Sequence, residues 1–67
     1  LYLQRLPSEV LDELYDLLQA LPLHLRYRAK QIAMQTVDDQ FGEETVPVGW
    51  MKESWPLVEC ELYGLSS

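Results

Sequence analysis

Residues 6–21, LPSEVLDELYDLLQAL, carry the strongest periodic pattern in the chain. Apolar side chains recur there with the spacing of one helix face: Val10, Leu11, Leu14, Leu17, Leu18 and Leu21. The opposite face carries four carboxylates: Glu9, Asp12, Glu13 and Asp16. Pro7 suits a first helical turn, and Pro22 disfavours helical geometry in the residue before it. The pattern therefore predicts an amphipathic helix over residues 7–21.

Residues 22–41 predict a second helix, with Pro22 in its first turn and Gly42 just beyond its end. Its apolar surface is wider than one partner helix requires, because two adjoining arcs are apolar. One arc contains Leu23, Tyr27, Ala33, Met34, Val37 and Phe41, and the other contains Leu25, Ala29, Ile32 and Thr36. We therefore expect two apolar neighbours: the first helix, and either the C-terminal segment or another molecule.

The C-terminal stretch, residues 50–65, fits two structures. As a helix, it would have Ser54 as its N-cap, Pro56 in its first turn and Gly64 as its stop. As a strand, it would turn alternate side chains from Val58 to Leu62 inward. A short helix is favoured slightly, because a lone strand would find only weak partners. Residues 42–49 are expected to be a linker. Residues 1–6 alternate apolar and polar side chains, as in an edge strand, a lead-in or an arm.

These segments predict a single mainly α domain over residues 1–67. Two amphipathic helices form a hairpin, and a short C-terminal helix or extended segment packs on it. A chain of 67 residues buries only about 60% of its unfolded surface. With one cysteine it has no internal disulfide, so its apolar 48% must pack efficiently or pack against a partner. Because the chain begins with Leu1 and not Met, we expect that it was trimmed or cut from a longer chain.

Composition also limits the classes of function that the chain can have. The net charge of −6 argues against direct nucleic-acid binding, which requires phosphate neutralisation by Lys and Arg. No apolar run approaches the ~20 residues of a membrane span. One cysteine without a signal peptide favours a reducing, cytoplasmic setting. His24 and Cys60, the single residues of their types, form no recognisable catalytic or metal-binding pattern, and Cys60 is expected to be buried. We therefore expect no catalytic residues, no metal and no cofactor.

The residues most suggestive of binding are aromatic, sulfur-containing or acidic. Tryptophan and methionine are enriched at interfaces, although in so small a protein they are equally expected in the core. Candidate partner contacts are Trp50, Met51, Trp55, Tyr27, Met34, Phe41, Asp12, Glu13 and Asp16. The acidic row is either an ordinary solvated face or a surface for a basic partner. The cations Arg26, Arg28 and Lys30 are either a basic patch for an acidic groove or phosphate, or partners of the first helix.

The opening LPSEVLDELYDLL resembles the start of many short bacterial helical proteins, including some small antitoxins. The segment GWMKESWPL is similar to their toxin-binding ends, whereas the middle helix does not fit that pattern. The LPxE start also resembles F-box-like modules, which this chain is too short to complete. The leading hypothesis is a protein-interaction module without catalysis that regulates or scaffolds a partner. The alternatives are an acidic inhibitor or antitoxin that covers a basic site, and a subunit that self-associates as a two-fold dimer.

Overall fold

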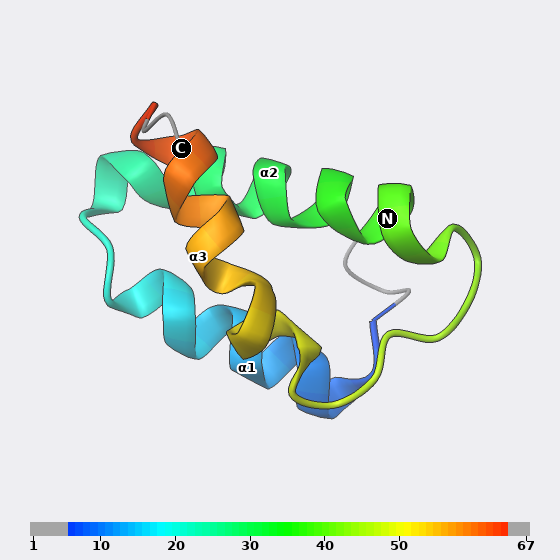
Figure 1. Ribbon diagram of the computed structural model, residues 1–67. Coiled ribbons are helices and arrows are strands. Elements are labelled where there is room, and N and C mark those ends of the chain that lie inside the picture. Colours follow the sequence, from blue (N-terminus) through cyan, green and yellow to red (C-terminus); the bar gives the residue numbers. More distant parts are fainter. Residues whose placement is uncertain (1–5, 65–67) are drawn as a thin grey trace.

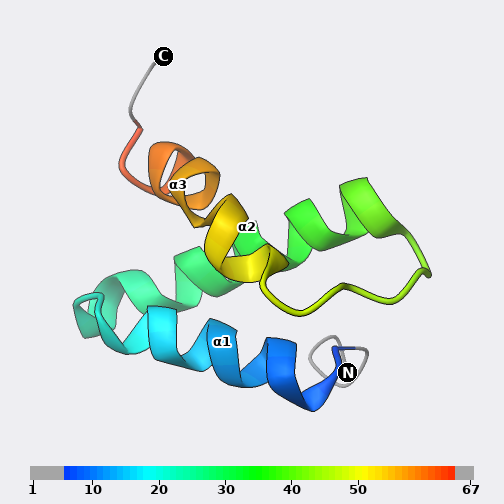
Figure 2. The same cartoon turned by 60° about the horizontal axis from the view of Figure 1, so that its bottom comes forward.

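The computed structural model describes residues 6–64, which fold into three helices and contain no strand. Helix α1 spans Ser8–Gln19, α2 spans Leu23–Phe41 and α3 spans Trp50–Leu62. Helices α1 and α2 run in opposite directions and are joined by a tight turn, so they form the expected hairpin (Figure 1). Helix α3 crosses this hairpin steeply and packs on both of its helices (Figure 2). The mainly α prediction is confirmed, and the C-terminal segment is a helix.

Apolar residues of all three helices form one core. The largest fully buried side chains are Leu14, Met51, Val10, Val37, Val46 and Val58. Ala29 and Ala33 of α2 are also completely buried, and small side chains at such positions allow neighbouring elements to approach closely. Helix α2 contacts both α1 and α3, so the second apolar neighbour expected for it is the C-terminal segment.

The first two helices are shorter than the sequence pattern predicts. Pro7 and Pro22 are the N-cap residues of α1 and α2 and precede the first helical turn. Helix α1 ends at Gln19, two residues before the predicted end at Leu21. The N–H groups of Ala20 and Leu21 donate to carbonyls three residues earlier, at Leu17 and Leu18. This tightening of the last turn is a common way to end a helix.

The predicted start of the C-terminal helix was wrong. Helix α3 begins at Trp50, so Pro56 lies inside the helix, where it lacks the N–H that would bond the carbonyl of Lys52. Ser54 is not an N-cap, because it lies inside α3, where its hydroxyl donates back to the Trp50 carbonyl at 2.9 Å. Helix α3 ends at Leu62 and is followed by Gly64, which has a positive φ of 70°. The predictions for residues 1–5 and 65 fall outside the described residues.

Candidate partner-binding pocket

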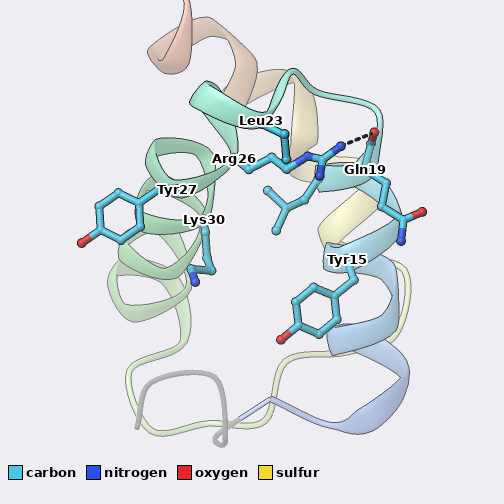
Figure 3. A pocket seen from close by; sticks show the side chains of 7 residues that line it. Tyr15, Gln19, Leu23, Arg26, Tyr27 and Lys30 are labelled. Atoms are coloured by element: carbon cyan, nitrogen blue, oxygen red, sulfur yellow. Dashed lines mark hydrogen bonds between the residues drawn. The ribbon is translucent and has the colours of Figure 1, made fainter.

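A pocket of about 480 Å³ lies between α1 and the first half of α2 (Figure 3). Its lining residues come only from these two helices, and α3 contributes none among the described residues. They are Tyr15, Leu18, Gln19, Leu23, Arg26, Tyr27 and Lys30. The α2 members at 23, 27 and 30 follow helical spacing, so one face of α2 forms one wall over two turns.

The walls of this pocket expose large apolar groups to solvent. Leu23 is 77% exposed, Tyr27 67% and Tyr15 44%, while Leu18, which also lines the pocket, is buried. In Figure 3, Tyr15 and Lys30 face the gap from opposite helices, and Tyr27 lies on the outer rim of α2. Exposed apolar side chains that gather at one concave site often mark an interaction surface. Half of the large exposed hydrophobic residues in the described part of the chain line this pocket.

Two cations complete the lining. The Nε–H of Arg26 donates to the Leu21 carbonyl at 3.0 Å, and an Nη2–H donates to the Gln19 carbonyl at 3.1 Å. The guanidinium thereby satisfies carbonyls at the C-terminal end of α1, where a positive charge also complements the helix dipole. The Lys30 Nζ lies 5.9 Å from the centroid of the Tyr27 ring, within cation–π range. Both charges are therefore held at the pocket.

The predicted acidic contacts divide into one structural residue and two exposed ones. The Glu13 carboxylate accepts the Gly49 N–H through both oxygens, at 3.1 Å for Oε1 and 3.0 Å for Oε2. Gly49 is the N-cap of α3, so Glu13 caps that helix from α1 and places negative charge at its positive end. Asp12 and Asp16 are exposed on the same helix.

Most of the predicted aromatic and methionine contacts pack inside the protein. Met34, Met51 and Trp55 are buried in the core and are not accessible to a partner in this fold. Phe41 and Trp50 are partly buried and pack edge to face, with ring centroids 5.0 Å apart. The Trp50 Nε1–H also donates to Gln40 Oε1 at 3.2 Å.

Sequence reasoning identified one pocket residue, Tyr27, as a partner contact. It did not assign Tyr15, Gln19 or Leu18 to a binding surface, because their pattern is that of an ordinary amphipathic helix. Their position in the chain could have indicated this surface, because residues just before and just after a hairpin turn lie side by side. The sequence also indicated a basic cluster of Arg26, Arg28 and Lys30. In the structure, Arg26 and Lys30 line the pocket and Arg28 does not.

Cys60 is exposed, so the expectation that it is buried was wrong. It lies on the part of α3 that faces away from the core. Within residues 6–64, no group of three His, Cys, Asp or Glu side chains is arranged to hold a metal ion. None of the described helices combines the length and the apolarity needed to cross a membrane.

A scan against protein-family models, a search of curated proteins and a search of solved structures each found no match to this chain.

Proposed function

We propose that this chain is a non-catalytic protein-interaction module that binds a partner protein in the α1–α2 pocket and thereby regulates or scaffolds it. The observation that supports this function is the exposure of Leu23, Tyr27 and Tyr15 around one pocket. Leaving these apolar groups in water is unfavourable, and a partner that covers them recovers about 25 cal/mol per Å² of buried apolar area. The proposal retains a cytoplasmic setting, because an exposed free thiol such as Cys60 persists in reducing compartments.

Position-specific cross-linking tests this proposal. The photoreactive residue p-benzoylphenylalanine would replace Tyr27 at the pocket rim or, as a control, Leu57, which is exposed on α3 outside the pocket. We expect irradiation of living cells to yield a discrete adduct only from position 27. The purified adduct protein should bind the unmodified chain, and Tyr27→Ala should weaken that binding about tenfold or more, as for an interface aromatic anchor. Equal adducts from both positions, or none from position 27, would refute the proposal.

An acidic inhibitor is the second candidate, and it rests on a different surface. Glu9, Asp12 and Asp16 are exposed on α1, whereas Glu13 is engaged by Gly49. Changing Asp12 and Asp16 to Lys should slow association with a basic target about tenfold and reduce its dependence on salt. Unchanged association and salt dependence would exclude this surface as the binding site.

A further inference from the structure

The charge of the α1–α2 pocket is opposite to the charge of the protein. The chain has 11 acidic residues and 5 Lys or Arg, and its net charge is −6. Two of those cations, Arg26 and Lys30, line the pocket, and none of its described lining residues is acidic. The pocket is therefore a local positive site, lined with exposed apolar groups, on a negatively charged molecule.

The cations in this pocket retain unused donors. A guanidinium has five N–H donors, and the two bonds that Arg26 makes to backbone carbonyls leave three of them. Lys30 contacts the face of Tyr27 through its charge, which leaves its N–H groups available to an acceptor. A carboxylate satisfies such donors with charge-assisted hydrogen bonds, which are stronger than neutral ones.

The size of the pocket limits the shape of its occupant. Lys30 lies seven positions after Leu23, a rise of about 10 Å along α2, or two helical turns. A short amphipathic helix that enters a groove between two helices presents apolar anchors at this spacing. A second copy of this chain is disfavoured, because two pockets placed face to face would oppose their own cations.

Resting on the proposed function, we infer that the α1–α2 pocket takes an acidic amphipathic segment of a partner protein. Bulky apolar side chains of that segment cover Leu23, Tyr15 and Tyr27. Its carboxylates, placed beside the apolar anchors, meet Arg26 and Lys30.

Two synthetic peptides of roughly 15 residues test this inference. Both carry leucines at helical i, i+3, i+4 and i+7 positions; one has glutamates and the other has lysines at the flanking positions. Binding would be followed by amide chemical shifts of the whole chain in about 0.15 M salt, where long-range repulsion is screened. We expect the glutamate peptide to shift amides around Leu23, Tyr27 and Tyr15 and to bind about tenfold more tightly than the lysine peptide. The net charge of −6 alone predicts the opposite preference.

Lys30→Glu should weaken binding of the glutamate peptide about tenfold, and Lys30→Gln should weaken it less. The matched control is Arg28→Glu, which reverses an exposed charge on the same helix outside the pocket and should change binding much less. Arg26 is kept, because it also caps α1. Equal binding of the two peptides, tighter binding of the lysine peptide, shifts confined to other surfaces, no binding, or a dimer formed through the pocket would each overturn the inference. If cross-linking from position 27 still gives a specific adduct, the proposed function survives that failure.

Discussion

The contact of Glu13 with Gly49 yields a quantitative prediction about stability. Glu13→Ala removes a partly buried carboxylate that accepts the Gly49 N–H through both oxygens. Hydrogen bonds to charged groups contribute about 1.5–3 kcal/mol, and a carboxylate at a helix N-terminus adds about 0.3–1 kcal/mol. Solvent can reach the freed N–H, so we expect a loss of about 2 kcal/mol. At roughly 0.05–0.15 kcal/mol per residue, this is a large part of the free energy of unfolding.

Circular dichroism during thermal unfolding measures this effect. A loss of about 2 kcal/mol corresponds to a fall in melting temperature of roughly 8–16 °C for a domain of this size. Glu13→Gln keeps one acceptor oxygen and should lose about half as much. The control is Glu9→Ala, which removes an exposed carboxylate from the same helix and should cost about 0.5 kcal/mol. Equal losses for the two alanine variants would refute the assignment of Glu13 as the cap of α3.

Three further predictions concern the core, the end of α1 and the start of α3. Met51 is completely buried, so Met51→Ala should cost about 2–5 kcal/mol by urea unfolding, whereas the exposed Leu57→Ala should cost under about 0.5 kcal/mol. Arg26→Met should cost about 1–2 kcal/mol by removing two carbonyl contacts, and an equal loss in exposed Arg28→Met would contradict this role. Gly49 has φ 93° and open space at its Cβ position, so Gly49→Ala should cost about 1–2 kcal/mol from backbone strain alone; an unchanged melting temperature would show that the turn adapts.

The helices and much of the core follow from sequence periodicity. The apolar face of α1 could be predicted because its spacing repeats over three turns. Val10, Leu14 and Leu18 are buried as that pattern predicts. Gly42 ends α2 with a positive φ of 58°, as its position after the apolar pattern suggested. These features are local, since each depends on neighbours within a few residues.

Features that depend on contacts between residues far apart in the chain could not be predicted from the sequence. At the start of α3, the Gly49 N–H donates to a carboxylate 36 positions away in the chain, a contact that local patterning does not show. The local pattern around Pro56 suggested a later start. Val46 is buried although it lies in a stretch read as a linker, because the return from α2 to α3 passes over the core. The pocket arises from the packing of α1 against α2, so the sequence pattern of either helix alone does not predict it. The positive charge of the pocket also depends on the fold, because the structure places Arg26 and Lys30 in the lining and Arg28 outside it.

Both tryptophans of the chain lie on α3, so the indole fluorescence of the protein comes from this helix alone. Trp55 is buried in the core and Trp50 packs against Phe41 of α2, so indole emission reports whether α3 is docked on the hairpin. The pocket contains two tyrosines, Tyr15 and Tyr27, and none of its lining residues is a tryptophan. A ligand that fills the pocket without disturbing α3 should therefore leave the indole spectrum unchanged, while unfolding shifts it to longer wavelength. Indole emission of the unlabelled protein therefore reports loss of the fold independently of whether the pocket is filled.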